Sequence, residues 1–282
     1  MRIILQGRWL TASLAQQIAQ MAGAGNIRQR NAALWGFEQF AAPVPLAQRT
    51  RIRAVANAAR ADVNFIDHPR PLASFKLAVM DMDSTLITIE CIDEIADMQG
   101  LKPQVAAITA AAMRGEIAYP ESLRRRLALL AGLDVAALER VYQERLRLSP
   151  GAESMLAGFK AAGLKTLLVS GGFTFFTGKL KPRLGLDFTH ANELATADGK
   201  LTGSVIGAVV DAEAKAARLA ATCAELGCAA IDAIAIGDGA NDLKMMAVAG
   251  LSVAYRAKPV VQAQAMTALN HNGLDAMLDF FT

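Results

Sequence analysis

The stretch "VMDMDSTL" at residues 79–86 places two aspartates, Asp81 and Asp83, directly after a hydrophobic run. The preceding residues 75–80, "FKLAVM", are typical of a buried strand that ends where Asp81 begins. An Asp-x-Asp pair on its own is more often a solvated turn than a functional site. Its meaning therefore depends on what the rest of the sequence brings to the same place.

Length, composition and charge limit the number of domains and the kinds of partner that this chain can have. The chain has 282 residues, 53% of them hydrophobic and 20% charged, which predicts two domains, or one domain with a sizeable insertion. The net charge of +3 is too small to indicate nucleic acid or an acidic membrane surface as a partner. No apolar run reaches about 18 residues, so we expect no membrane span. The three cysteines lack zinc-site spacing, which indicates reduced thiols and a cytoplasmic location.

The chain after residue 75 alternates strands and helices, with one interruption. Residues 89–149 predict helices alone, with starts marked by Pro103, Pro120 and Asp134. Further buried strands are predicted at residues 165–170, 233–237 and 251–255, and Asp198-Gly199 predicts a hairpin turn. Strands that alternate with helices indicate a largely parallel sheet covered on both faces, interrupted after its first strand by the helical segment.

Three of these strands end in polar turns. The first ends at Asp81, the second in "SGGF" at residues 170–173, and the third in "GDGAND" at residues 237–242. Ligands of open parallel sheets bind outside the carboxyl ends of the strands, so we expect the three turns to converge. Each signal is modest alone, since "SGG" is often only a tight turn and "GDGAND" lacks the later glutamate of an EF-hand. Their shared position makes the combination much stronger.

The converged turns suit phosphate chemistry. Carboxylates from Asp81 and Asp238 suit Mg²⁺, which prefers oxygen ligands, and a helix behind Gly171 and Gly172 would offer N–H donors to a phosphate. No GxxxxGK[ST] loop occurs, so a small phosphate ester is a better substrate than ATP. A carboxylate attacking phosphate meets repulsion of roughly 4 kcal/mol per unit charge at about 4 Å and an effective dielectric of about 20. One aspartate as nucleophile and a second as acid/base would explain the pair.

The motifs resemble a known family. "DMDST", "SGGF", a lysine and "GDGAND", in this order, resemble the four motifs of the haloacid dehalogenase superfamily. "DMDSTLITIECIDEIA", "ESLRRRLALL" and "VSGGF" resemble the phosphoserine phosphatases within it, and the likeness extends from residue 75 to residue 270. The resemblance implies an α/β, Rossmann-like core with a helical cap. It also implies Mg²⁺-dependent hydrolysis of O-phospho-L-serine to L-serine and phosphate, the last step of serine biosynthesis, through an aspartyl-phosphate.

The resemblance also implies the catalytic and metal-binding roles. Asp81 would be the nucleophile and a metal ligand. Asp83 would be the general acid/base and would offer its backbone carbonyl to the metal. Asp238 would complete the protein ligands to Mg²⁺, and Asp242 would support it.

The substrate contacts follow from the same resemblance. The phosphate would be held by Ser170, Gly171, Gly172, Lys215 and Asn241. Glu90 would meet the substrate ammonium and Arg126 its carboxylate, which a planar guanidinium binds bidentately. Met113 and Tyr119 would line the cap side, with Tyr119 standing where phenylalanine is expected. Without the resemblance, Glu90 is simply a first-turn helix acid and Lys215 an ordinary surface lysine.

The resemblance divides the chain into a core of residues 73–88 and 150–282, a cap of residues 89–149, and an N-terminal domain of residues 1–72. The N-terminal order strand, helix, two strands, helix, strand resembles the ferredoxin-like ACT module, an α+β fold that often binds amino acids or pairs subunits. We therefore expect a homodimer through this domain, with serine as a plausible ligand. The alternative is a docking domain without a ligand.

Two other functions stay open. One is a related phosphatase or phosphotransferase acting on another small phosphomonoester. The other is an amino-acid-sensing protein that is phosphorylated on Asp81 but does not hydrolyse the phosphoryl group. Asp83 argues against the second, because an acid/base two residues from the nucleophile favours turnover over storage.

Overall fold

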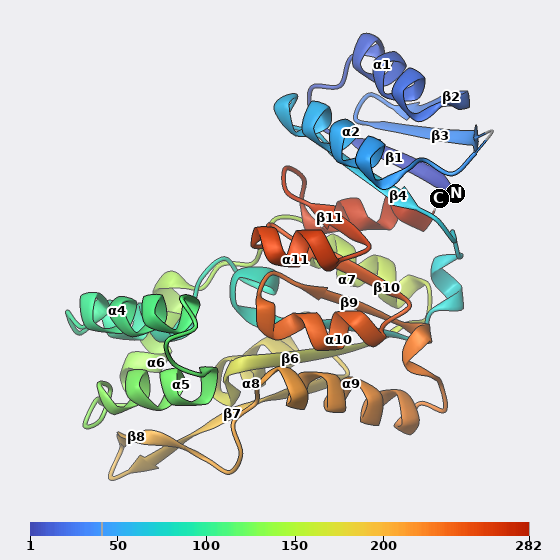
Figure 1. Cartoon of the computed structure of the whole chain (residues 1–282). Helices are drawn as coiled ribbons and strands as arrows, with labels where there is room; N and C mark the ends of the chain where they lie inside the picture. Colours follow the sequence, from blue (N-terminus) through green and yellow to red (C-terminus); the bar gives the residue numbers. More distant parts are fainter. Residues whose placement is uncertain (41, 282) are drawn as a thin grey trace.

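The computed structural model describes residues 1–40 and 42–281, apart from the side chain of residue 113 (Figure 1). Its strands form two sheets, one at the N-terminus and one in the remainder of the chain. The N-terminal unit consists of β1 (Arg2–Gln6), α1 (Ala12–Ala22), β2 (Ala24–Asn31), β3 (Leu34–Phe40), α2 (Leu46–Ala58) and β4 (Asp62–Ile66). Its sheet is antiparallel in the order β2-β3-β1-β4, which is the ferredoxin-like arrangement expected from the sequence.

Alternation along β1 explains how this small sheet is covered on both faces. Ile3 and Leu5 pack with Ile18 of α1 and Ile52 of α2. Ile4 points to the opposite face and joins the hydrophobic core of the larger unit. The N-terminal sheet is therefore sandwiched between its own helices and the rest of the molecule.

The second sheet has seven strands in the order β11-β10-β9-β5-β6-β7-β8. Its strands are β5 (Leu77–Met80), β6 (Lys165–Phe173), β7 (Phe188–Ala197), β8 (Lys200–Ile206), β9 (Ala233–Gly237), β10 (Leu251–Tyr255) and β11 (Thr267–Leu269). All neighbouring pairs are parallel except β7 and β8, which form the hairpin predicted at Asp198-Gly199. Both turn residues have positive φ, as a two-residue hairpin loop requires. The predicted α/β class with a largely parallel sheet is confirmed.

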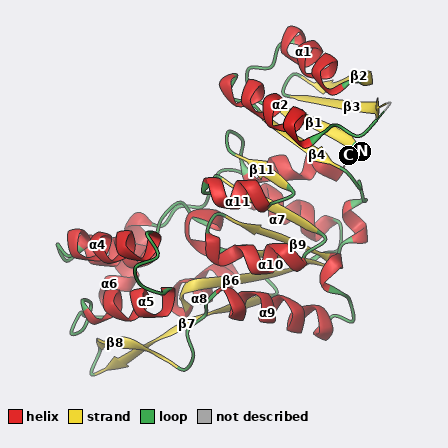
Figure 2. Cartoon of the chain, in the orientation of Figure 1, coloured by secondary structure: helices red, strands yellow, loops and turns green. Residues whose placement is uncertain are grey.

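Helices cover both faces of this sheet and form a separate group beyond one end of it (Figures 1 and 2). The covering helices are α7 (Ala152–Ala161), α8 (Thr174–Leu184), α9 (Ala212–Glu225), α10 (Leu243–Val248), α11 (Pro259–Gln264) and a terminal 3₁₀ segment (Leu274–Phe281). The separate group holds α3 (Cys91–Asp97), α4 (Lys102–Met113), α5 (Tyr119–Ala128) and α6 (Ala136–Arg140). The expectation of helices alone over residues 89–149 is wrong only at two isolated β-bridges, Asp134 with Lys200 and Leu148 with Ile87.

The two sheets meet edge to edge through side chains. The amide of Asn64 on β4 accepts from the Ala268 N–H at 2.8 Å and donates to the Ala268 carbonyl at 2.9 Å, as a strand residue would. The carboxylate of Asp62 accepts from three successive backbone N–H groups, beginning with Asn270 at 2.8 Å. These contacts fix the N-terminal unit on β11, three strands from β5.

None of the helices described is both long enough and apolar enough to cross a bilayer.

Candidate active site

The three polar turns meet because their strands are neighbours in the order β9-β5-β6. Met80 at the end of β5 stands in register with Leu168 on one side and Ile236 on the other. The next residue, Asp81, donates its N–H to the Ile236 carbonyl at 3.0 Å, which extends the ladder into the turn. The turns after β5 and β9 and the carboxyl-terminal end of β6 therefore lie at one edge of the sheet, as the sequence predicts.

Three carboxylates gather at this edge. Oxygens of Asp81, Asp238 and Asp242 lie within 4.8 Å of one another. Asp242 is anchored because its Oδ2 accepts the N–H groups of Asp238 and Gly239, at 3.1 and 3.0 Å. Asp238 accepts from the Thr85 hydroxyl at 3.1 Å. An all-oxygen set of this kind fits a hard divalent cation.

The same crowding shifts the titration of these groups. Burial, followed by the charge of Asp242, raises the pKa of Asp238 to about 6. Burial and Asp242 also raise the pKa of Asp81 well above its usual range, against the opposing effect of Lys215. Negative charges this close repel one another, and the repulsion raises the pKa of a neighbouring carboxylate. A cation bound between them would offset that repulsion.

Lys215 is not a surface lysine but a completely buried one. It lies on α9, whose first turn is capped by Asp211 through a 3.0 Å bond to the Ala214 N–H. Its Nζ lies 2.8 Å from Asp81 Oδ1 and 2.7 Å from Asp242 Oδ1. Burial alone would lower the pKa of Lys215, but the two carboxylates outweigh burial and raise it. The ammonium therefore stays charged between them.

Asp83 occupies a sharp turn rather than a helix. The next residue, Ser84, has φ +57°, and this left-handed residue turns the chain back toward α3. Asp83 Oδ1 accepts from the Cys91 N–H at 3.1 Å. Burial, and then the nearby charge of Glu90, raise the pKa of Asp83 to about 7. A carboxyl group with that pKa can both give and take a proton near neutrality.

The residues of "SGGF" belong to the extended end of β6, and α8 begins only at Thr174. The glycine at position 172 allows a close approach, because a Cβ there would lie 2.6 Å from Asp83 Oδ2 and 3.0 Å from Ser170 Oγ. The Gly172 N–H donates to Ser170 Oγ at 2.8 Å. The carbonyl of Gly171 accepts from the Tyr119 hydroxyl at 3.2 Å, which brings the cap onto this loop.

The cap side contributes two further groups. Glu90 immediately precedes α3, and its Oε1 accepts from the Ser84 hydroxyl at 2.8 Å. Arg126 on α5 is 8% exposed and donates from Nε to the Ser122 carbonyl at 3.4 Å. Burial raises the pKa of Glu90, while the Arg126 charge is one of the effects that lower it. Arg126 likewise opposes the burial that raises the pKa of Tyr119 to about 12.

The structure thus brings most of the candidate residues to one place. Asp81, Asp83, Ser170, Gly171, Gly172, Lys215, Asp238 and Asp242 surround the sheet edge, and Glu90, Tyr119 and Arg126 approach from the cap. Asn241 lies in the turn after β9, where its Oδ1 would meet a Cβ placed on Gly239 at 2.2 Å. The side chain of Met113 lies outside what the structure describes.

Two residues of this site did not emerge from the sequence. The buried side chain of Asn192 on β7 donates to the Gly171 carbonyl and accepts from the Val210 N–H, both at 2.8 Å. β7 carries polar residues at several positions, so no signal in the sequence marked Asn192. Lys258 donates its N–H to the Asp238 carbonyl at 3.1 Å, and its charge lowers the pKa of Glu90 and Asp238 against their burial. Both residues support the turns that carry the candidate groups.

Comparison with known proteins gives the family. The haloacid dehalogenase-like hydrolase family matches residues 78–247. A protein of Polaromonas sp. strain JS666 named phosphoserine phosphatase is 56% identical over 222 residues, which cover 77% of this chain and 94% of that protein. A crystal structure of a HAD family hydrolase from Salmonella enterica serovar Typhi aligns with a TM-score of 0.90 at 31% identity, covering 99% of this chain and 97% of that one.

A third comparison is with another solved structure. A structure described as a phospho-aspartyl intermediate analogue of phosphoserine phosphatase aligns with a TM-score of 0.70 at 38% identity. It covers 74% of this chain and 99% of that chain. The chain therefore belongs to the haloacid dehalogenase-like hydrolases, within the phosphoserine phosphatase family.

Proposed function

We propose that this chain hydrolyses O-phospho-L-serine to L-serine and phosphate, with Mg²⁺ as cofactor and an aspartyl-phosphate on Asp81 as intermediate. The reaction would be the last step of serine biosynthesis, in the cytoplasm. The observation that carries the proposal is the buried Lys215, held between Asp81 and Asp242 beside Asp238. A charged lysine at that place offsets the repulsion between a carboxylate nucleophile and a phosphate.

The residues at the sheet edge fit a magnesium ion. Asp81, Asp238 and the backbone carbonyl of Asp83 would hold it, with Asp242 behind them. When bound, the ion supplies positive charge that neutralises the phosphate oxygens and the crowded carboxylates.

In the first half-reaction, Asp81 forms a bond to phosphorus while the ester bond from phosphorus to the serine oxygen breaks. Asp81 Oδ1 already accepts from the Met82 N–H and from Lys215, each at 2.8 Å, so Oδ2 is the freer oxygen for attack. The leaving serine oxygen takes its proton from Asp83. The pKa of about 7 leaves Asp83 protonated in a substantial fraction of molecules near neutrality.

In the second half-reaction, the Asp83 carboxylate takes a proton from water as that water attacks phosphorus. The bond between Asp81 and phosphorus breaks, and inorganic phosphate leaves. Ser170, Gly171, Gly172 and Asn241 would hold the phosphoryl oxygens through both steps. Asn192 would keep the Gly171 segment in place through its bond to the carbonyl.

Selection of the substrate would fall to the cap. Glu90 would accept from the ammonium of O-phospho-L-serine and Arg126 would bind its carboxylate. Met113 and Tyr119 would line the same side. Both charged groups lie at the junction of cap and core, so closure of the cap over the substrate would bring them onto it and exclude water.

We assign a separate role to each of three parts of the chain. Residues 73–88 and 150–282 would form the catalytic core, residues 89–149 the cap, and residues 1–72 an ACT-like domain that pairs subunits as a homodimer. The ferredoxin-like order of the N-terminal sheet supports the last assignment. Serine, as the product, would be the first ligand to try on this domain.

The deciding assay measures phosphate release from O-phospho-L-serine with Mg²⁺ and, separately, with excess chelator. Asp81→Asn serves as the control, because it keeps the shape of the nucleophile and removes its charge. We expect turnover only in the wild type with Mg²⁺. Faster turnover of another phosphomonoester would point to the related phosphatase instead, and a phosphorylated Asp81 that never releases phosphate would exclude hydrolysis.

A further inference from the structure

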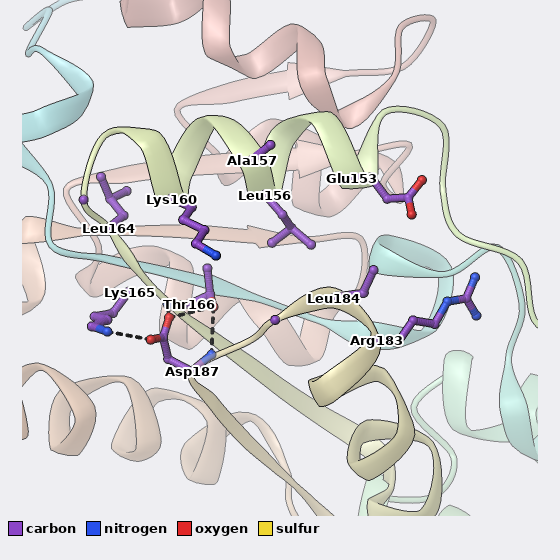
Figure 3. A pocket seen from close by; sticks show the side chains of 12 residues that line it. Glu153, Leu156, Ala157, Lys160, Leu164, Lys165, Thr166, Arg183, Leu184 and Asp187 are labelled. Atoms are coloured by element: carbon purple, nitrogen blue, oxygen red, sulfur yellow. Dashed lines mark hydrogen bonds and ion pairs between the residues drawn. The ribbon is translucent and has the colours of Figure 1, made fainter.

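The two ends of β6 are held in different ways. At its start, where the strand borders a cavity, Asp187 accepts from Lys165 Nζ at 2.7 Å (Figure 3). At its other end, the register of β6 against β7 shifts between Val169 and Phe173. Residues 170–172 therefore lack regular partners in the β6–β7 ladder, although they form the candidate phosphate segment. The orientation of this segment depends on contacts from side chains.

The peptide unit that joins Gly171 to Gly172 is held at its carbonyl by two side chains. The Tyr119 hydroxyl donates to the Gly171 carbonyl at 3.2 Å, and the Asn192 amide donates to the same oxygen at 2.8 Å. A carbonyl oxygen has two lone pairs, so these two donors occupy both. Asn192 lies on β7 of the core, whereas Tyr119 begins α5 of the cap. One of the two donors thus comes from a separate part of the chain.

The contact between Tyr119 and the segment depends on both residue types. A Cβ built on Gly171 would lie 2.2 Å from the Tyr119 oxygen, so any larger residue there would displace the hydroxyl. Burial raises the pKa of Tyr119 to about 12, and the hydroxyl therefore remains a hydrogen-bond donor near neutral pH. Phenylalanine, which the family resemblance predicts at this position, has no hydroxyl and could not donate. The bond is therefore specific to the tyrosine of this chain.

The opposite side of the same peptide faces the candidate active site. In a trans peptide the carbonyl and the N–H point in opposite directions, so fixing one of them aims the other. The Gly172 N–H donates to Ser170 Oγ at 2.8 Å. Ser170 is completely buried, and its hydroxyl, which accepts this bond, still has its own hydrogen to donate. A chain of hydrogen bonds therefore connects the cap, through one peptide, to a hydroxyl assigned to phosphate.

We propose that the Tyr119 hydroxyl is a positioning group that couples closure of the cap to the orientation of the Gly171–Gly172 peptide and of Ser170. Closure would bring the hydroxyl onto the carbonyl, and the fixed peptide would hold Ser170 Oγ with its hydrogen directed at a phosphate oxygen. Such coupling is reciprocal, so phosphate bound at the core would also favour the closed cap. The proposal rests on the function proposed above, because it takes the phosphate of that reaction as the ligand.

Hydrogen-exchange mass spectrometry of the full chain tests the coupling, with inorganic phosphate and Mg²⁺ as the probe. Phosphate is added at a concentration that fully inhibits turnover of each variant. We expect it to slow amide exchange in α5 several-fold in the wild type and to leave α5 unchanged in Tyr119→Phe. A hydroxyl that only helped packing would lower the stability of Tyr119→Phe without removing this dependence on phosphate.

Steady-state kinetics supply a second measurement. Tyr119→Phe should lower kcat/KM for O-phospho-L-serine about three- to tenfold, the effect expected of one hydrogen bond between uncharged groups. Tyr142→Phe is the matched control, because the Tyr142 hydroxyl of the cap forms no hydrogen bond with any residue that the structure describes. This change keeps the ring that Lys179 Nζ overlies at 5.2 Å, and it should match the wild type in both measurements. Urea unfolding would confirm that both variants fold.

The coupling is refuted if phosphate does not protect α5 in the wild type, or if it protects α5 equally in Tyr119→Phe. It is also refuted if the wild type hydrolyses O-phospho-L-serine and Tyr119→Phe has the same kcat/KM. Either result leaves the proposed function intact. If the wild type releases no phosphate from O-phospho-L-serine, the proposed function fails and the coupling fails with it.

Discussion

Replacing Lys215 by methionine tests the electrostatic account of the site most directly. The substitution keeps the volume of the side chain and removes the only cation that contacts Asp81 and Asp242 within the part of the chain that the structure describes. Three carboxylates then crowd one another, and Asp81 and Asp242 lose the cation that contacts them. Removing one partner from a buried ion pair typically costs about 3–5 kcal/mol. We take about 3 kcal/mol, because the two carboxylates can relieve part of the strain by taking up a proton.

The pH dependence follows from the direction of the shifts. The pKa of Asp81 is already raised by burial and Asp242, and losing Lys215 raises it further. An acid whose folded pKa exceeds its unfolded value destabilises the fold at high pH, and stability returns as the pH falls through the folded value. The variant should therefore recover stability from pH 8 toward pH 5. Added Mg²⁺ should restore part of it at neutral pH.

The assay is urea unfolding and thermal melting at pH 7.5 in chelator, repeated at pH 5.5 and with Mg²⁺. A loss of about 3 kcal/mol corresponds to a melting temperature lower by roughly 6–12 °C at this chain length. Lys244→Met is the matched control, because Lys244 pairs with Glu213 on the surface and should matter by less than about 1 kcal/mol. If Lys215→Met melts like the wild type in chelator, the buried-pair account is wrong.

Three further predictions concern substrate selection, the phosphate segment and the N-terminal unit. Arg126→Ala should raise KM for O-phospho-L-serine by about 10–100-fold, since a charged hydrogen bond contributes about 1.5–3 kcal/mol. The KM for phosphoethanolamine, which lacks the carboxylate, should stay nearly unchanged. Steady-state kinetics with both substrates would measure the difference. Asn192→Ala should lower kcat, because the Gly171 carbonyl loses a buried partner. The same loss should lower the free energy of unfolding, measured in urea, by about 2 kcal/mol. The bond from Arg49 lowers the pKa of Asp67, so this partly exposed pair should contribute less than about 1 kcal/mol at pH 7 and lose that contribution as the pH falls below about 4. Unfolding of Asp67→Asn and wild type at pH 7 and pH 3 would measure it.

Much of the fold followed from local patterns in the sequence. The buried strands after residue 75 are continuous apolar runs, and the turn at Asp198-Gly199 carries its own conformational signature. The two isolated bridges of the cap were not predictable in this way. The Asp134 bridge joins residues 66 positions apart with no strand pattern around Asp134, so only the packing of cap against hairpin determines it.

Some residues of the site could likewise be predicted from local sequence, and others depend on tertiary packing. Asp81 and Asp238 could be found because each directly follows an apolar strand. The burial of Lys215 could not, since its place inside the protein depends on α9 packing against β6 rather than on its neighbours in sequence. Asn192 is a similar case, because both of its partners come from other segments.

The charges at the sheet edge explain why stability and chemistry are linked in this molecule. Asp81, Asp83, Asp238 and Asp242 surround the buried Lys215, with Lys258 as a further cation that acts on Asp238, so the folded chain alone carries an excess of negative charge there. Such an arrangement raises the free energy of the unliganded fold near neutral pH, and a bound cation lowers it again. The same cation would offset the negative charge of the carboxylate cluster, so that a phosphate could bind beside it. A core packed only for stability would have no reason to hold these carboxylates together, which is why the cluster indicates function more strongly than any one of its residues.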